Sequence, residues 1–174
     1  ERTVAIWGDY DVDGVTGTAL LVDFLRERGV SPLWRLPVRA EEGYGLNSAG
    51  IEELAAAGVQ VLVTVDCGIT SVAEVARAKE LGLTVIVTDH HLPGPHLPPA
   101  DAVVDPKLAD GPGTDLAGVG VAFFLAAALN RLLPGEPSDV RRLLDLVALG
   151  TLADVVPLRG PNRILAKNGL LLLA

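Results

Sequence analysis

The chain has 174 residues, 49% of them hydrophobic, and a formal net charge of −8 at pH 7. This length is enough for one sizeable domain with its own core, and no apolar run reaches the ~18 residues of a membrane-spanning segment. The acidic balance disfavours a chain that holds nucleic acid with a broad basic face, but bound cations would offset many of the 22 acidic residues, so charge alone excludes no substrate.

One cysteine, Cys67, excludes an internal disulfide and is typical of a reducing cytoplasm. We expect it to be a small buried side chain rather than a nucleophile, because no base lies beside it. No basic segment followed by an apolar one predicts a secretory signal. Because the chain starts at Glu1 and contains no Met, we expect it to be an excised or processed piece.

Short apolar runs and glycine stops divide the first half of the chain into alternating strands and helices. A strand is predicted at residues 3–7, and helical spacing of apolar residues follows at 16–28, before Gly29. The next elements are a strand, a polar loop, a helix, a strand and a helix, at residues 32–36, 37–47, 48–57, 60–65 and 71–81.

The second half begins with a buried strand at residues 84–87 and continues with a proline-rich loop. The remaining elements are a short strand, a polar turn region and three helices, at residues 102–104, 107–116, 119–133, 139–149 and 162–174. Ser138 is the expected cap of the helix at 139–149. The pattern predicts an α/β fold: a three-layer parallel sheet with helices on both faces and a helical C-terminal flank.

Acidic residues follow three of the predicted strands. Asp9, Asp11 and Asp13 follow the first strand, Asp66 follows the strand at 60–65, and Asp89-His90-His91 follows the strand at 84–87. Because open α/β sheets place their sites at the carboxyl ends of the strands, we expect these groups to meet. Clustered carboxylates repel one another, and a divalent cation is the usual way to neutralise them.

The three alternating aspartates have other possible explanations, a capped turn or a calcium loop. A calcium loop of the EF-hand type needs a preceding helix and a Glu at its twelfth position, which here is Leu20. Asp66 alone could be only a helix cap. The adjacent histidines are the sharper signal, because imidazole and carboxylate together favour Mn²⁺, Fe²⁺ or Zn²⁺. His96, in the proline-rich loop, is expected to be solvated.

Asp154 lies in the apolar segment GTLADVVPL, where a charge is costly unless it is paired or binds a metal. Arg159 or Arg163 is the alternative partner.

In order and spacing, DYDVDG, VDCG, DHH and GTLADVVPL resemble the four motifs of the DHH phosphoesterase superfamily, over the whole chain. VRAEEGYGLN and LAGVGVAFFLAAAL look like its RecJ-type branch, the single-strand-specific 5′→3′ DNA exonucleases of repair and recombination. The resemblance implies a hydrolase that uses two ions, Mn²⁺ or Mg²⁺, and releases 5′-mononucleotides.

The resemblance also implies roles for individual residues. The metal-binding set is Asp9, Asp11, Asp13, Asp66, His90 and Asp154. Asp66 would bridge the ions and take part in catalysis, His91 would contact the scissile phosphate or support the site, and Asp89 would orient a histidine.

Two departures from the family pattern stand out. Asp105-Pro106 lies where Asn-Pro is expected, and we interpret it as a turn. Residues 1–174 match the DHH catalytic domain, and the second, DHHA1-type domain, which would supply much of the grip on single-stranded DNA, is absent from this sequence. Replication or repair proteins are possible partners, and a membrane is not.

Three other hypotheses stay open. One is a DHH enzyme for a small phosphate substrate: pyrophosphate, polyphosphate, an oligoribonucleotide or a cyclic dinucleotide. Another is an inactive DHH scaffold that acts as an interaction module, although every expected ligand is present. The last is a response-regulator-like or Rossmann binding domain, which explains neither the two histidines nor Asp154.

Overall fold

The computed structural model describes residues 2–174 and contains a five-stranded, fully parallel sheet. The strands are β1 (Val4–Gly8), β2 (Leu33–Arg35), β3 (Val61–Val65), β4 (Thr84–Thr88) and β5 (Ala102–Val104), in the spatial order β2-β1-β3-β4-β5. The helices are α1 (Val12–Glu27), α2 (Arg39–Glu42), α3 (Ser48–Ala56), α4 (Val72–Glu80), α5 (Gly118–Leu132), α6 (Leu144–Ala153) and α7 (Gly160–Leu173). The predicted fold class is therefore confirmed.

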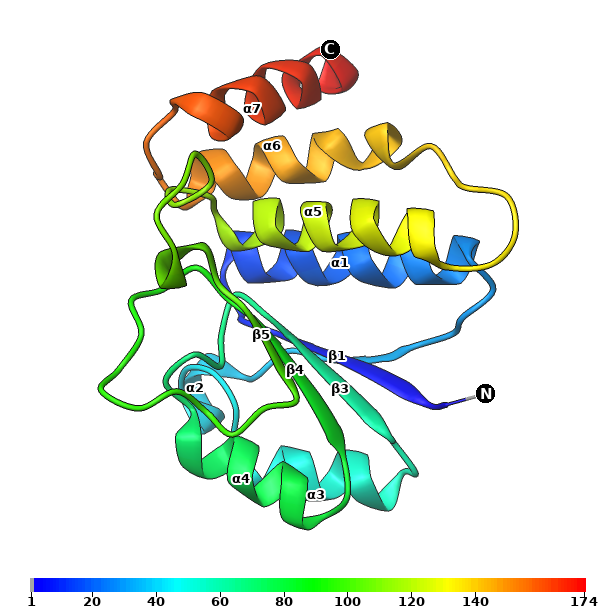
Figure 1. Cartoon of the computed structure of the whole chain (residues 1–174), viewed down its shortest axis with the longest axis vertical. Coiled ribbons are helices and arrows are strands. Elements are labelled where there is room, and N and C mark those ends of the chain that lie inside the picture. The colour runs from blue at the N-terminus through cyan, green and yellow to red at the C-terminus, as the bar shows by residue number, and fades with distance from the viewer. Residues whose placement is uncertain (1) are drawn as a thin grey trace.

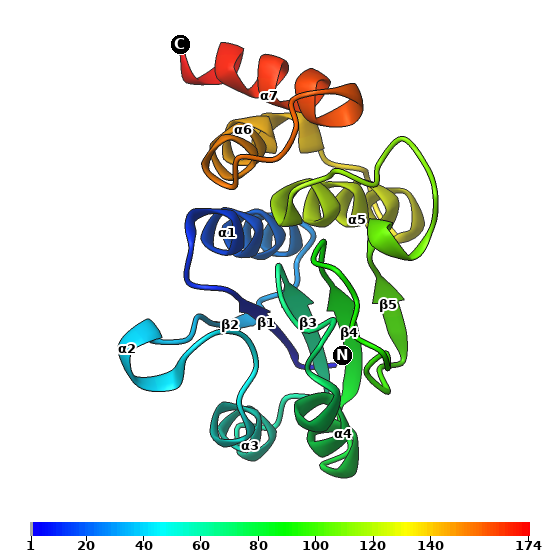
Figure 2. The ribbon, with the colours of Figure 1, turned by 90° about the vertical axis from the view of Figure 1, so that its left-hand side faces the viewer.

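The helices lie in layers on the two faces of the sheet. α3 and α4 cover one face and α1 and α5 the other, while α6 and then α7 stack farther out on the α1–α5 side (Figure 1). Figure 2, turned by 90°, shows the same order of layers, with the short α2 projecting beside the edge strand β2. The predicted helical flank is thus α6 and α7. Among residues 2–174, no helix combines the length and the hydropathy needed to cross a membrane.

Side chains alternate across the sheet and divide the core in two. In β1, Ile6 faces the cluster under α1 and α5, whereas Ala5 and Trp7 face the cluster under α3 and α4. All three are fully buried. The central strands are therefore fixed from both faces, so the positions of their carboxyl ends are well defined.

Most element boundaries lie within two residues of the predictions, and three regions differ more. α1 begins at Val12 rather than 16, because the side chain of Asp11 caps it by accepting a hydrogen bond from the Gly14 N–H at 3.0 Å. The predicted polar loop contains the single-turn helix α2. The helix predicted at 139–149 starts as a 3₁₀ turn (Val140–Leu143) and then becomes α6, which continues to Ala153.

Ser138 is not the cap of that segment. The side chain of Asp139 accepts from the Arg141 N–H, while Ser138 is held by the side chain of Asn130. Ser138 thus anchors the connection between α5 and the 3₁₀ turn.

Candidate metal centre

Parallel pairing brings the acidic strand ends together. Gly8 pairs with Val65 at the ends of β1 and β3, so the next residues, Asp9 and Asp66, are neighbours at the same edge. The β4 end follows, where the Asp66 N–H donates to the carbonyl of Thr88. Asp9 and Asp66 are 2% and 1% exposed, so both carboxyl groups are withdrawn from water.

Asp66 itself has an unusual backbone. Its φ of 61° lies in the left-handed region, which non-glycine residues seldom adopt and which is often found at functional sites. The first residue of α5 comes so close that a Cβ on Gly118 would lie 2.6 Å from the Asp66 Oδ1 atom. A glycine at position 118 is therefore required for Asp66 to occupy this place.

Asp13 is held by the start of α5 rather than by the loop after β1. Its Oδ2 accepts the Gly118 N–H at 2.6 Å, and its Oδ1 accepts the Val119 N–H at 2.8 Å. These are free N–H groups of a helix N-terminus, which favour a negative charge. The three alternating aspartates thus have different positions: Asp11 caps α1, Asp13 lies in the first turn of α1, and Asp9 lies at the end of β1.

His90 is the point where the elements meet. Its Nε2 atom lies 3.0 Å from the Asp66 Oδ1, 3.7 Å from the Asp13 Oδ2 and 3.8 Å from the Asp154 Oδ2. Asp154 is the C-cap residue of α6, so carboxylates from three separate parts of the chain surround one imidazole nitrogen.

Several buried polar atoms in this region have no hydrogen-bond partner among residues 2–174. They are the Oδ1 atoms of Asp9 and Asp66 and the Nε2 atom of His90. Buried polar atoms are normally paired, so unpaired acceptors that face one another indicate a ligand. A divalent cation fits them, because it would be bound by carboxylate oxygens and a neutral imidazole together.

The candidate ligand atoms form three overlapping groups, in each of which the atoms lie within 4.8 Å of one another. The groups are Asp9-Asp11-Asp66, Asp13-His90-Asp154 and Asp66-His90-His91. Asp66 and His90 each belong to two groups. The structure therefore brings together all six residues of the predicted metal-binding set.

Asp89 and His91 form a second arrangement beside this centre. The Asp89 Oδ1 accepts from the His91 Nδ1 at 2.7 Å and from the His90 N–H at 2.8 Å, while its Oδ2 accepts the Ile69 N–H at 2.9 Å. Burial alone would raise the pKa of Asp89, but these hydrogen bonds outweigh it and lower the pKa. The bond to Asp89 in turn raises the pKa of His91 to about 9.

His91 is therefore cationic at neutral pH, and its side chain is 45% exposed. Asp89 fixes the ring, and the exposed edge can meet an anion from solution.

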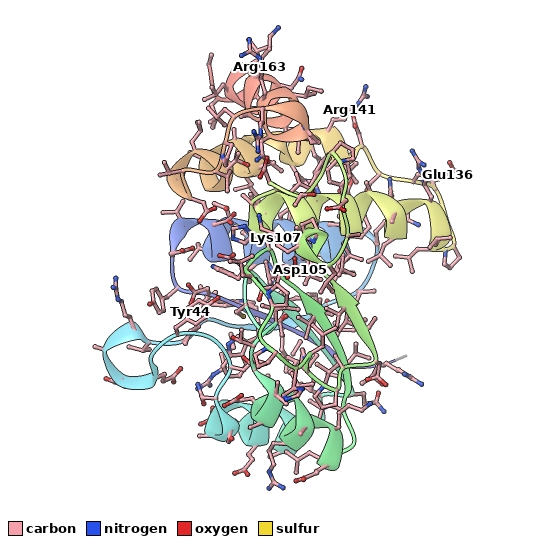
Figure 3. The ribbon with its side chains drawn as sticks, turned by 60° about the vertical axis from the view of Figure 1, so that its left-hand side comes forward. Tyr44, Asp105, Lys107, Glu136, Arg141 and Arg163 are labelled. Carbon is pink, nitrogen blue, oxygen red and sulfur yellow. The ribbon has the colours of Figure 1, made fainter. Side chains whose placement is uncertain are left out.

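Tyr44 is a residue of this site that the sequence did not single out. Its hydroxyl donates to the Asp66 carbonyl at 3.2 Å and lies 3.2 Å from the His91 Nδ1. In Figure 3, Tyr44 lies on the loop after α2, and Asp105 and Lys107 lie near the carboxyl end of β5. Only its place within VRAEEGYGLN hinted at a role for Tyr44.

Burial and like charges make the free carboxylates unfavourable. Burial first, and then the charges of Asp13 and Asp11, raise the pKa of Asp66 to about 10. Burial also raises the pKa of Asp13, to about 6, against the hydrogen bonds from α5. At neutral pH the centre therefore favours a proton or a metal cation.

The other candidates have simpler surroundings. The Cys67 thiol is fully buried, its pKa is raised by that burial, and its Sγ donates to the Trp7 carbonyl. Arg159 pairs with Asp115 at 2.7 Å, and neither it nor Arg163 forms an ion pair with Asp154 within the described residues. His96 is exposed.

Comparisons with known proteins match this geometry. The family model described as DHH family, N-terminal domain, matches residues 3–151. The single-stranded-DNA-specific exonuclease RecJ of Salmonella typhimurium is 49% identical over 96% of this chain and 31% of its own length. The Bacillus subtilis protein of that name is 46% identical over 98% of this chain and 21% of its own length. The chain thus spans a third or less of these curated relatives.

Solved structures of RecJ proteins have the same fold as this chain. A crystal structure of exonuclease RecJ bound to manganese superposes with a TM-score of 0.89 at 44% identity, covering 98% of this chain and 43% of that one. RecJ from Thermus thermophilus in complex with Mn²⁺ superposes with a TM-score of 0.84 at 40% identity, covering 98% of this chain and 24% of that one. With its strand-end carboxylates, its paired histidines and these matches, the chain belongs to the DHH family.

Proposed function

We propose that this chain is the metal-binding catalytic domain of a single-strand-specific 5′→3′ DNA exonuclease that releases 5′-mononucleotides. The observation that carries the proposal is the His90 Nε2 atom, buried without a hydrogen-bond partner and faced by Asp13, Asp66 and Asp154 within 3.8 Å. Similarity to RecJ proteins over nearly the whole chain supports the substrate class. We further propose that it acts in DNA repair and recombination, in the cytoplasm.

The residues present fit two Mn²⁺ or Mg²⁺ ions. Asp9 and Asp11 would hold one, Asp13, His90 and Asp154 the other, and Asp66 would contribute to both. Such ions supply Lewis acidity, which activates a water molecule and stabilises the attacking and leaving oxygens of a phosphodiester.

The protein's own contribution to the reaction lies in His91, Asp89 and Tyr44. His91 carries a positive charge and would donate a charge-assisted hydrogen bond to a phosphate oxygen. Asp89 holds the ring through its Nδ1 atom and so leaves the other nitrogen for the substrate. Tyr44 closes the other side of the ring, 5.8 Å away and nearly perpendicular to it.

Digestion of labelled oligonucleotides tests this proposal. With Mn²⁺, a 5′-labelled single strand should lose its label as mononucleotide at once, whereas a 3′-labelled strand should shorten gradually. A matched duplex should persist. Selective hydrolysis of pyrophosphate or polyphosphate would replace this proposal with the small-substrate alternative, and no hydrolysis of any phosphate ester would favour the scaffold.

The binding of single-stranded DNA is a separate part of the proposal. The chain carries 14 basic residues against 22 acidic ones. We propose that it supplies the metal chemistry, and that a DHHA1-type domain outside this sequence supplies most phosphate contacts. This chain alone should then bind single strands weakly and with a shallow salt dependence.

Salt titrations of a fluorescent oligonucleotide, with this chain and with a version extended to the length of its relatives, would measure both slopes. Tight and strongly salt-dependent binding by this chain alone would contradict the division of labour.

A further inference from the structure

Of the three ligand groups, Asp13-His90-Asp154 depends most on elements outside the strand ends. Asp154 lies at the end of α6, and Asp13 is fixed by the first N–H groups of α5. The spacing of the Asp13-His90-Asp154 group therefore depends on how the turn after α6 is fixed relative to the segment that leads into α5.

The turn after Asp154 is strained. Val155 has φ 62°, a left-handed conformation that is a genuine outlier for a β-branched residue, and its side chain is 84% exposed. The side chain thus makes little contact that could hold this backbone. Such a conformation persists only where the surrounding structure determines it.

Asn162, in the first turn of α7, holds the segment that follows this turn. Its side chain is 1% exposed, and its amide nitrogen donates to the carbonyl of Pro157 at 3.2 Å and to the carbonyl of Asp115 at 2.5 Å. Pro157 is three residues after Asp154, and Asp115 is three residues before Gly118. One amide group therefore ties the turn after Asp154 to the segment whose helix holds Asp13.

We propose that Asn162 is a positioning residue for the Asp13-His90-Asp154 group, an inference that rests on the proposed function because it presumes metal binding there. It touches neither metal nor substrate. By fixing Pro157 and Asp115 together, it sets the separation of the Asp154 and Asp13 carboxylates. The Asp9-Asp11-Asp66 group comes from the ends of β1 and β3 and the cap of α1, with none of which Asn162 forms a hydrogen bond.

The test is Mn²⁺ binding to the metal-free chain, followed by the electron paramagnetic resonance of free Mn²⁺ and by calorimetry. Asn162→Ala should lower the affinity for one of the two Mn²⁺ ions by roughly 10–100-fold, the usual effect of losing a group that orients a ligand. The affinity for the other ion should stay within about threefold of the original. Asn162→Leu keeps a side chain of similar volume and removes both donated hydrogen bonds without burying a charge. It serves where the alanine variant does not fold.

Asn130 is the matched control. It is also a buried asparagine, 8% exposed, whose amide donates to the Ser138 carbonyl at 2.8 Å and so ties together two segments. It lies twelve residues after Gly118 on α5, about 18 Å from the metal end of that helix. Asn130→Ala should lower the melting temperature without changing either Mn²⁺ affinity.

The outcomes separate the two proposals. Two ions bound by the original chain with unchanged affinities in both Asn162 variants would overturn this inference and leave the proposed function intact. Equal weakening of both ions in a folded variant would also overturn it. A chain that binds no Mn²⁺ at all would overturn the proposed function, and this inference with it.

Discussion

Aspartates and glutamates serve two different purposes in two regions of this molecule. On the α3–α4 face, Arg77 pairs with Glu52 and Glu80 at 2.8 and 3.1 Å, and Lys79 pairs with Asp101 at 2.6 Å, all in contact with solvent. At the carboxyl edge of the sheet, buried acids face one another and two histidines. No Lys or Arg pairs with Asp9, Asp13 or Asp66 in the described chain.

The protein accepts a loss of stability at the carboxyl edge of the sheet and not on the α3–α4 face. Exposed pairs place each charge beside an opposite one at little cost. The buried edge accumulates like charges that burial penalises, and it does so with residues whose backbone and helix contacts are individually fixed. An arrangement that costs stability and is nevertheless well fixed is typical of a functional site.

Replacement of a central ligand should have the largest effect. His90→Ala removes the one nitrogen that faces three carboxylates, and we expect Mn²⁺-dependent hydrolysis to fall on the order of 10³-fold or more, with the fold retained. Asp66→Ala should do the same. Rates and circular dichroism should be measured beside Lys79→Ala, which removes a charge from the paired face. Near-normal rates with normal metal content in His90→Ala would refute the site.

The free energy of unfolding should depend on pH, and bound metal should counteract that dependence. In the metal-free chain the folded pKa values of Asp13 and Asp66, about 6 and about 10, lie above their unfolded values. The folded state therefore binds more protons, and the free energy of unfolding should fall as the pH rises from about 4 through 6 and beyond. The raised pKa of His91 acts in the same direction between about pH 6.5 and 9.

Mn²⁺ requires the ligands to be deprotonated, so the stabilisation that it gives should grow over the same pH range. At about 1,000 times its Kd, one ion adds roughly 4 kcal/mol, or about 10 °C in the melting temperature. Thermal melts at pH 5.5 and 8, with Mn²⁺ and with chelator, measure this. A melting temperature that Mn²⁺ leaves unchanged at pH 8 would contradict a preformed site.

Much of the metal edge and the fold class could be predicted from the sequence. Strand ends are predictable because apolar runs followed by Asp9, Asp66 and Asp89 mark them, and parallel strands end at one edge. Asp154 was predicted as a ligand because a charge is unusual in an apolar segment. The fold class followed from the alternation of strands and helices.

What the sequence could not predict depends on long-range contacts. Asp13 is bound by N–H groups 105 and 106 residues away, and Tyr44 reaches the carbonyl of a residue 22 positions on. The early start of α1 depends on whether Asp11 acts as its cap, which the motif leaves open. Asn162 appeared only as the beginning of a helix.

Asp105 follows the edge strand β5 at the carboxyl edge of the sheet, and replacing it should stabilise the protein rather than destabilise it. It is 7% exposed; its Oδ1 accepts the Lys107 N–H, and its Oδ2 has no partner among residues 2–174. Burial, with the charge of Asp89, raises its pKa. Asp105→Asn keeps the cap and removes the charge, so we expect a higher free energy of unfolding at pH 8.

The gain should shrink as the pH falls from 8 toward 4, because the raised pKa lets the folded carboxyl group take up a proton more readily than the unfolded one. Urea unfolding at both pH values would measure it. A loss of stability at pH 8 would mean that the Asp105 charge is paired in solution.

Removal of a paired surface charge should have the smallest effect. Arg77→Ala breaks the hydrogen bonds to Glu52 and Glu80, but the arginine is exposed, and such pairs contribute little and are screened by salt. We expect the melting temperature to change by no more than about 2 °C, by less still in 0.5 M salt, and the Mn²⁺ affinity not at all. Melts at low and high salt, with and without Mn²⁺, test both statements. A drop as large as that caused by chelator would show that the paired face, and not only the metal edge, sets the stability of this fold, and the contrast between the two regions would fail.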